Sequence, residues 1–482
     1  MAAPSPKSTA APQALSPREI LTRDTFTSGE TAVFTMVVLL LALASWLPPA
    51  AYWWVFGMGL ILAALNPAVA RLHELTHPFF ISHLWRKWFL LQLPFWLLLV
   101  YYLMGLLNPS LQAIGTTTNQ QELLALAPPS AHWPTVPSAG VGWQLIGQFA
   151  GAYLVSVMLF MVPKSRAFFL RLLPWLGLNA VLLALLGYLQ RAFGIEKIIG
   201  IFEPSNSRYF ATFGAEAQWL AFALLWSGVL TGLCLLHYRL EKQPGDFVRG
   251  MGPWFGCGSL VLLGSGLLCD AGMAQVYFWL AAAALFACFG WFFIRAKQTK
   301  SNNAAAVWIV PWLLVAVGCV VLAWQRWQLH MDTQPYAMAT AWEMLSARPW
   351  LGWGADSFAW IAPFFRSDFS DPSTTNATSD ILLWLTAFGW LGSLLILGLP
   401  LLLLLKDALS LLRFRLSCFI LTALAGLFAI ASVQSVLDHY AVAMSFWLLF
   451  FVALRWSHIS RTEADRVDQT PYLIFPKPQR RT

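Results

Sequence analysis

Long apolar runs separated by short polar breaks dominate this chain. Most runs hold about 20 residues, the length at which a helix rising about 1.5 Å per residue crosses about 30 Å of hydrocarbon. The pattern predicts twelve membrane spans, near residues 32–48, 50–68, 88–107, 142–162, 170–190, 215–237, 254–270, 274–294, 305–324, 379–405, 414–434 and 439–456. Pro400 lies within one long run and predicts a kink there, not the end of a helix.

Composition supports this interpretation and indicates how the chain divides into two tails and a transmembrane domain. Of its 482 residues, 58% are hydrophobic and 11% charged, whereas soluble proteins have roughly 25% charged residues. The six cysteines lie in or beside apolar runs, so we expect neither disulfides nor a thiolate metal site. Residues 1–31 are rich in Ala, Pro and Ser and predict a disordered cytoplasmic tail, followed by a transmembrane domain over 32–456 and a second cytoplasmic tail over 457–482.

The distribution of basic residues tests the number of spans. Lys and Arg concentrate in cytoplasmic segments of membrane proteins. With the amino terminus inside, 24 of the 30 Lys and Arg residues fall on the inner side and six on the outer side. One missed or invented helix in the middle would destroy this asymmetry. The pattern therefore predicts a multi-pass protein with both termini cytoplasmic, and it explains the net charge of +8 without a nucleic-acid partner.

Three predicted outer segments are long enough to carry a site. They cover about residues 108–141, 191–214 and 325–378. The third is the largest and contains nine ionisable residues. The expected fold is thus an all-α polytopic membrane protein with one large outer loop between helices 9 and 10 and its chemistry on the outer face.

Two motifs carry a resemblance to a known family. Residues 348–358 read RPWLGWGADSF, and residues 380–392 read DILLWLTAFGWLG. They resemble the O-antigen ligase and O-antigen polymerase superfamily, whose large outer loop contains Arg-Pro-x-x-Gly-x-Gly-x-x-x-Phe and leads into a helix ending Gly-x-x-Gly. Gly352 and Gly354 suit a tight turn. Arg348 and Asp356 are the charged residues of this outer-loop motif.

A third element extends the resemblance to about residues 145–455. The run RYFATFG at residues 208–214 is similar to the family's Arg-x-x-Gly-Thr-Phe-Gly, although the Asn that usually follows is absent. The resemblance implies transfer of a polyprenyl diphosphate-linked saccharide to a lipid or glycan acceptor at the outer face of a bacterial inner membrane, with no metal and no cofactor. Arg191 and Arg208 are the diphosphate candidates, because guanidinium groups form paired, charge-assisted hydrogen bonds. Anchoring to lipid phosphates is the alternative role for them.

The chain departs from the family at its general base. The family's histidine element aligns with residues 376–380, where the sequence is NATSD and only Asp380 remains. The family's Ser-Arg-Gly at the outer end of the seventh span is replaced by Cys-Asp-Ala-Gly at 269–272. Asp380, Asp438, His439 and His330 are therefore the substitute catalytic candidates, with structural polar contacts as the ordinary alternative for each.

Other polar residues admit further interpretations. Glu216 and Asp270 lie near outer span ends, where they would pair with Arg191 or Arg208 or contact an acceptor sugar. The run HELTH at residues 73–77 matches a zinc-binding pattern, but it lies in a predicted cytoplasmic loop without a third ligand and is interpreted as a solvated helix end.

Three functions follow from these observations. The first is a membrane glycan transferase of the ligase or polymerase type. The second is a catalytically inactive relative that binds lipid-linked glycan or acts as a scaffold in envelope polysaccharide assembly. The third is a transporter, which the concentration of polar residues in one outer loop and the nearly charge-free spans disfavour.

Overall fold

The structure is a computed structural model of the full chain. It describes residues 26–47, 57–59, 61–62, 65, 81–116, 122–126, 130, 133–138, 141–195, 197, 209–240, 249–297, 309–330, 336–365 and 379–469.

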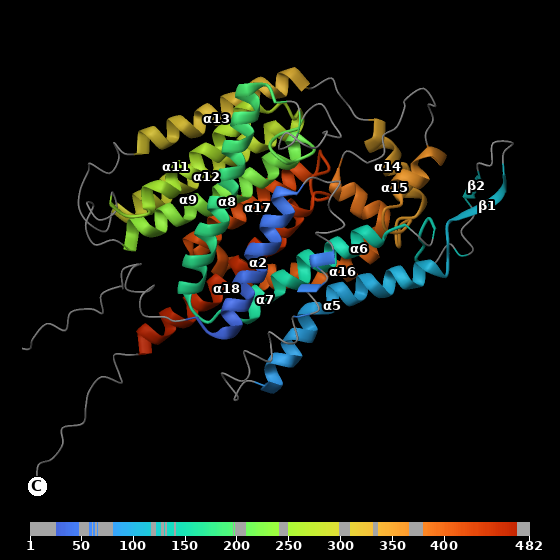
Figure 1. The fold of residues 1–482 in the computed structure, drawn as a ribbon, viewed down its shortest axis with the longest axis horizontal. Coiled ribbons are helices and arrows are strands. Elements are labelled where there is room, and N and C mark those ends of the chain that lie inside the picture. Colours follow the sequence, from blue (N-terminus) through green and yellow to red (C-terminus); the bar gives the residue numbers. More distant parts are fainter. Residues whose placement is uncertain are drawn as a thin grey trace, which may run out of the picture.

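Helices account for most of the described residues. They are α2 (Ser28–Trp46), α5 (Ile81–Leu106), α6 (Trp143–Phe149), the π-helical turn η3 (Ala150–Leu154), α7 (Val155–Met161), α8 (Arg166–Phe193), α9 (Glu216–Leu240), α11 (Gly252–Gly264), the 3₁₀ turn η4 (Ser265–Leu268), α12 (Met273–Lys297), α13 (Ile309–His330), α14 (Tyr336–Ala347), α15 (Phe358–Ile361), the 3₁₀ turn η5 (Ala362–Phe364), α16 (Asp380–Arg413), α17 (Arg415–Ala431) and α18 (Tyr440–Gln469). Figure 1 shows their arrangement.

The helices identify a polytopic helical membrane protein. Within the described residues, eight helices are long and apolar enough to cross a membrane, and three shorter apolar helices accompany them. These eleven helices coincide with eleven of the twelve predicted spans. The remaining span, near residues 50–68, lies mostly outside the described residues. The number twelve therefore stays a prediction, as does the orientation of the termini.

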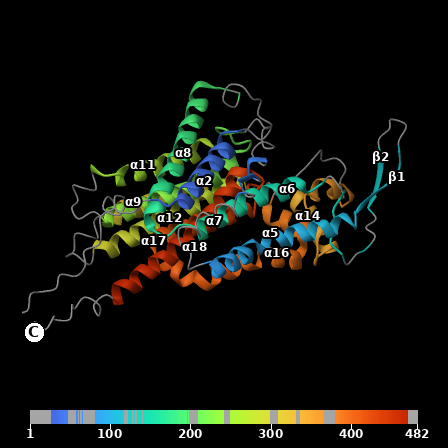
Figure 2. The ribbon, with the colours of Figure 1, turned by 60° about the horizontal axis from the view of Figure 1, so that its bottom comes forward.

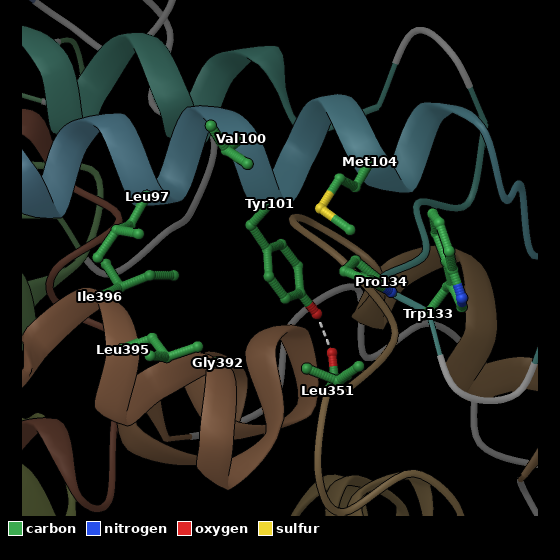
Figure 3. Close-up of a pocket in the computed structure, with 10 residues that line it drawn as sticks. All are labelled: Leu97, Val100, Tyr101, Met104, Trp133, Pro134, Leu351, Gly392, Leu395 and Ile396. Carbon is green, nitrogen blue, oxygen red and sulfur yellow. Dashed lines mark hydrogen bonds between the residues drawn. The ribbon is translucent and has the colours of Figure 1, made fainter.

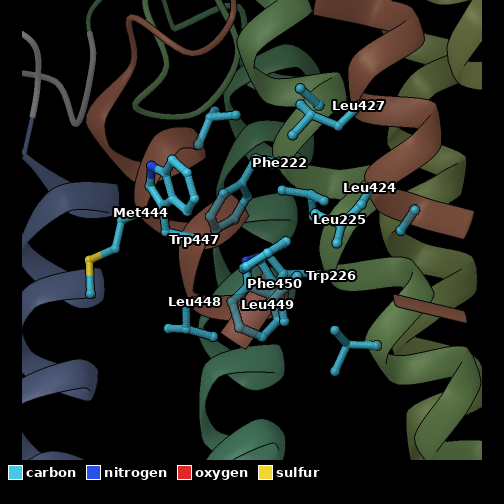
Figure 4. Close-up of a cluster of buried hydrophobic side chains, with 14 of the residues drawn as sticks. Phe222, Leu225, Trp226, Leu424, Leu427, Met444, Trp447, Leu448, Leu449 and Phe450 are labelled. Carbon is cyan, nitrogen blue, oxygen red and sulfur yellow. The ribbon is translucent and has the colours of Figure 1, made fainter. Parts of the chain in front are cut away.

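The apolar core is built around α9. This helix is almost wholly buried and packs against α8, α11, α12, α17 and α18. Figure 4 shows how its Phe222 and Trp226 meet Leu424 from α17 and Trp447 from α18. Because lipid tails are as apolar as these side chains, close packing holds such helices together and hydrophobic burial adds little. The polar first turn of α9 is consequently held firmly at one end of the bundle.

A second group of helices lies beside this core. α5 runs alongside α16, and the continuous segment α6, η3 and α7 packs against α18 (Figures 1 and 2). In the buried turn η3, Tyr153 packs edge-on against Trp447 with ring centroids 4.8 Å apart. α16 remains one element through Pro400, and its non-helical residue is Gly389.

Part of the first outer segment forms a hairpin. The strands β1 (Leu111–Thr116) and β2 (Glu122–Leu126) pair antiparallel, with a register shift between Ala113 and Gly115. The hairpin projects beyond the end of α5 (Figure 2).

Candidate functional site

The predicted outer loop docks where α16 is broken. Gly389 has φ 65° and ψ −176°, which interrupts the helix. Backbone groups freed by the break bond to the loop instead. Five backbone hydrogen bonds join the two segments: Trp353 N to Thr386 O (2.8 Å), Gly354 N to Ala387 O (2.8 Å), Trp390 N to Pro349 O (2.8 Å), Leu391 N to Trp350 O (3.0 Å) and Gly392 N to Trp350 O (3.4 Å). Irregular backbone at membrane depth is tolerated only where its polar groups are satisfied by protein or water. Loop residues 349–354 therefore complete α16.

The two motif glycines make this docking sterically feasible. Gly352 has φ 60° and Gly354 has φ 97°, the left-handed region that glycine adopts at little cost. A Cβ atom at Gly352 would lie 2.6 Å from the backbone of Ala387, and one at Gly354 would overlap the carbonyl of Thr135. The sequence predicted a turn at these glycines, and the structure adds that two other segments approach them closely.

Arg348 joins the first outer segment to the third. Its guanidinium donates to Thr135 Oγ1 at 3.1 Å and to the carbonyl oxygens of Ser130 and Trp133 at 3.0 and 3.1 Å. It also lies 5.1 Å from the ring centroid of Trp353, within the range of a cation–π interaction. The side chain is buried. Arg348 therefore occupies a structural position between the outer segments.

Asp356, the remaining motif residue, lies at the start of α6. It has φ 53°, and its carboxylate accepts a hydrogen bond from the backbone N–H of Leu145 in the first turn of that helix. A negative charge is favourable there, because the N–H groups of a first helical turn lack intrahelical acceptors. The outer-loop motif thus contacts α6 as well as α16.

Asp380 organises the turn between α17 and α18. Its Oδ1 accepts from Ser435 Oγ at 2.9 Å, and its Oδ2 accepts from the N–H groups of Val436 and Leu437 at 2.7 and 2.8 Å. The residue is buried. Three donors satisfy both oxygens, which is the arrangement of a carboxylate that fixes a loop.

Asp438 lies on the same turn and is accessible. Gln218 of α9 donates to its Oδ1 at 3.0 Å, and Gln148 of α6 donates to its carbonyl oxygen at 2.9 Å. Surrounding protein atoms disfavour the charged form and raise the pKa of Asp438 to about 6, although its side chain remains open to solvent. The Asp380 carboxylate is close enough to interact with it electrostatically. A carboxyl group with this pKa accepts a proton readily near neutral pH.

His439 follows Asp438 but has a different environment. Its imidazole is buried and stacks on Phe213, with ring centroids 4.3 Å apart. The two side chains therefore lie in different environments, although they are neighbours in the sequence.

Arg191 belongs to a chain of charged groups at neighbouring helix ends. Its guanidinium bonds to Glu216 Oε1 and donates to the carbonyl oxygen of Tyr209 at 3.3 Å. Glu216 Oε2 accepts from the N–H of Asp270 at 2.6 Å, and the Asp270 carboxylate lies 3.3 Å from Arg326. Of the alternatives that the sequence left open for Glu216, the structure shows the pairing with Arg191. Arg191 remains 42% exposed, so part of its guanidinium still faces solvent.

Three predictions fall outside the described region. Arg208 and the segment containing His73 and His77 belong to the residues that are not described, and the same is true of the side chain of His330 at the end of α13. Among the residues whose placement is described, no group of three His, Cys, Asp or Glu side chains is arranged to hold a metal ion.

The first turn of α9 brings together the groups that the sequence predicts for the outer face. Glu216 contacts Arg191, while Gln218 contacts Asp438. Residues two apart on a helix point to different sides, so the cation and the carboxylate flank this turn. Sequence reasoning missed Gln218. The sequence did hold a signal for it, because Glu216 and Gln218 lie together at the end of an otherwise apolar span, where polar residues are costly.

Comparison with known proteins adds no family assignment. No family model matches the chain, and no curated protein matches it.

Proposed function

We propose that the chain is a membrane glycan transferase of the O-antigen ligase or polymerase type, acting at the outer face of a bacterial inner membrane. Its donor would be a polyprenyl diphosphate-linked saccharide, and its acceptor a lipid or a second glycan. The observation that supports this most is the arrangement around the first turn of α9, where an accessible carboxylate, Asp438, and a partly exposed cation, Arg191, lie on either side of one helix end.

Asp438 is the proposed general base. In the transfer step, the acceptor hydroxyl gives its proton to the Asp438 carboxylate, and its oxygen bonds to the anomeric carbon of the donor. The bond between that carbon and the phosphate oxygen breaks, and polyprenyl diphosphate leaves with the electron pair. Among the catalytic candidates, Asp438 has the side chain open to solvent and the pKa suited to this role.

The remaining candidates receive other roles in the proposal. Asp380 positions the turn that carries Asp438, since its oxygens are occupied by three donors. His439 supports the same turn from within the core. Arg191 stabilises the departing diphosphate, together with Arg208, which the motif places in the same outer segment.

Catalytic inactivity is the second candidate function, and particular contacts favour it. Glu216 already neutralises Arg191, and the histidine positions of the family are occupied by other residues. Such a protein would bind lipid-linked glycan or hold a partner enzyme without performing transfer.

Deletion and complementation in the source organism separate these functions. Removal of the chain should cause polyprenyl diphosphate-linked glycan to accumulate in membrane extracts, as measured by mass spectrometry. The full chain should restore the extractable lipid to its original level, whereas Asp438→Asn and Arg191→Gln should not. Glu343→Gln, at an exposed position of α14, and Arg413→Gln, at the exposed end of α16, are the matched charge controls.

Each result has a defined meaning. No accumulation on deletion refutes a role in the glycan pathway. Accumulation that both site variants fully relieve, at equal protein levels, refutes catalysis at this site and favours the inactive relative.

A further inference from the structure

Two features lie between neighbouring apolar helices. One is the apolar groove between α5 and α16, where the Tyr101 hydroxyl donates to the carbonyl oxygen of Leu351 (Figure 3). The described residues that line this groove include no thiol, carboxylate or imidazole. The other is the interface between α12 and α17, where two thiol groups meet. Of the two features, the second therefore holds the reactive groups.

The contacts between α12 and α17 define a close antiparallel interface. A Cβ atom at Gly426 would lie 2.5 Å from the Cβ of Ala281. Further along α12, the ring centroid of Phe292 lies 5.7 Å from the guanidinium of Arg415 and 6.0 Å from the ring centroid of Phe419. Residue numbers rise along one helix as they fall along the other, so the helices are antiparallel and face each other between these contacts.

Cys288 and Cys418 oppose each other within this interface. Both are free thiols, and their Sγ atoms lie within hydrogen-bonding distance of each other. Thr422 Oγ1 lies 3.9 Å from Cys288 Sγ and donates to the carbonyl oxygen of Cys418 at 3.0 Å. A disulfide requires Cα atoms about 4.4–6.8 Å apart and side chains that point toward each other. Close helix packing and opposed thiols are the arrangement that suits such a bond.

The thiol pair is accessible from the surface of the spans. Cys418 is buried, whereas Cys288 is partly exposed. Cys288 also belongs to the candidate membrane span Met273–Phe292, so its exposed part faces hydrocarbon. Water and polar solutes are scarce in hydrocarbon. An oxidant that reaches this pair is therefore an apolar one.

We propose that Cys288 and Cys418 form a reversible disulfide that a lipid-soluble quinone generates. Each thiol loses its proton, and a bond forms between the two Sγ atoms. The two electrons and two protons reduce the quinone to a quinol, which returns to the bilayer. A dithiol reductant reverses the step by thiol–disulfide exchange. A reversible disulfide departs from the expectation drawn from the apolar positions of the cysteines, because helix packing brings two of them together.

The disulfide links α12 to the first turn of α17, and the other end of α17 leads into the turn that carries Asp438. The redox step itself is independent of the proposed transferase activity.

Thiol counting in the purified full chain tests this step. The reduced protein in nanodiscs is incubated without air with decylubiquinone, a fully substituted quinone that accepts electrons and does not add to thiols. The protein is then denatured and labelled with a maleimide, and mass spectrometry counts the labels. The chain contains six cysteines, so the count should fall from six to four. Digestion without reductant should give peptides joined through Cys288 and Cys418, and dithiothreitol should restore all six thiols.

Three serine variants locate the bond. Each has five thiols. Cys288→Ser and Cys418→Ser should keep all five after quinone treatment, whereas the control Cys257→Ser, which removes an exposed thiol of α11, should lose two. Six labels in the quinone-treated wild type, equal thiol loss in Cys288→Ser, or equal loss without quinone would each overturn the proposal. A disulfide between Cys234 and Cys257 in place of the proposed one would overturn it as well.

Discussion

Replacement of Arg348 by Met is the sharpest test of how the predicted outer segments are held together. The methionine keeps much of the apolar length of the side chain but removes three hydrogen bonds, to Thr135, Ser130 and Trp133. Each is worth about 1 kcal/mol net. Loss of the contact with Trp353 adds about 0.5–1 kcal/mol. Arg348→Met should therefore weaken the docked loop by about 3–4 kcal/mol.

Hydrogen exchange of the full chain in nanodiscs measures this loss locally. The amides of Trp353 and Gly354 bond to α16, and the amide of Ser110 bonds to the carbonyl oxygen of Val136 in the first outer segment. If these amides exchange through opening of the docked loop, their rates should rise by about two to three orders of magnitude, because about 1.4 kcal/mol corresponds to a factor of ten.

Arg413→Met is the matched control, since Arg413 is an exposed arginine at the other end of α16. Its exchange at the three reporter amides should equal that of the wild type. Arg348→Lys should give an intermediate effect, because an ammonium group cannot reproduce the fork of a guanidinium. Wild-type exchange in Arg348→Met would refute the idea that this arginine joins the two outer segments.

Three further results are expected. Gly389→Ala should prevent accumulation of folded protein, because residue 389 has a positive φ and its new Cβ would overlap the backbone of Trp350. Gly398 has open space around it, so Gly398→Ala should fold normally, as judged by size-exclusion chromatography after extraction. Glu216→Gln should destabilise the chain by about 1–3 kcal/mol, because the buried carboxylate is replaced by a weaker, neutral acceptor. When Arg191→Gln is added to this variant, the further loss of stability should be smaller than that of Arg191→Gln alone. Additive effects in this double-mutant cycle would contradict the ion pair. The raised pKa of Asp438 means that the folded state binds a proton more tightly than the unfolded state, so stability should fall as the pH rises from about 4 to about 6. Asp438→Asn should remove this part of the pH dependence, measured by thermal unfolding. An unchanged pH dependence would contradict the pKa shift.

Much of the fold was predictable because the bilayer imposes a simple requirement on sequence. Eleven helices lie where apolar runs were recognised, since a span must be about 20 residues long and must satisfy its own backbone hydrogen bonds. The pairing of Glu216 with Arg191 was also within reach, because a charged residue near a span end needs a partner of opposite sign.

The candidate site was less predictable, because the role of a polar side chain depends on partners distant in sequence. Arg348 bonds to Thr135, 213 positions away, and Asp380 bonds to Val436, 56 positions away. Asp438 and His439 are neighbours in the chain, yet one side chain is accessible and the other is buried against Phe213.

The sequence by itself determined the helical membrane architecture and marked Gly352 and Gly354 as a turn. Only the tertiary structure decided that this turn completes a helix broken at Gly389 and that the motif arginine is buried between outer segments. The physical reason is that the bilayer sets the length and apolarity of each span separately. Hydrogen bonds and pKa shifts, in contrast, arise from groups that meet only when the segments pack.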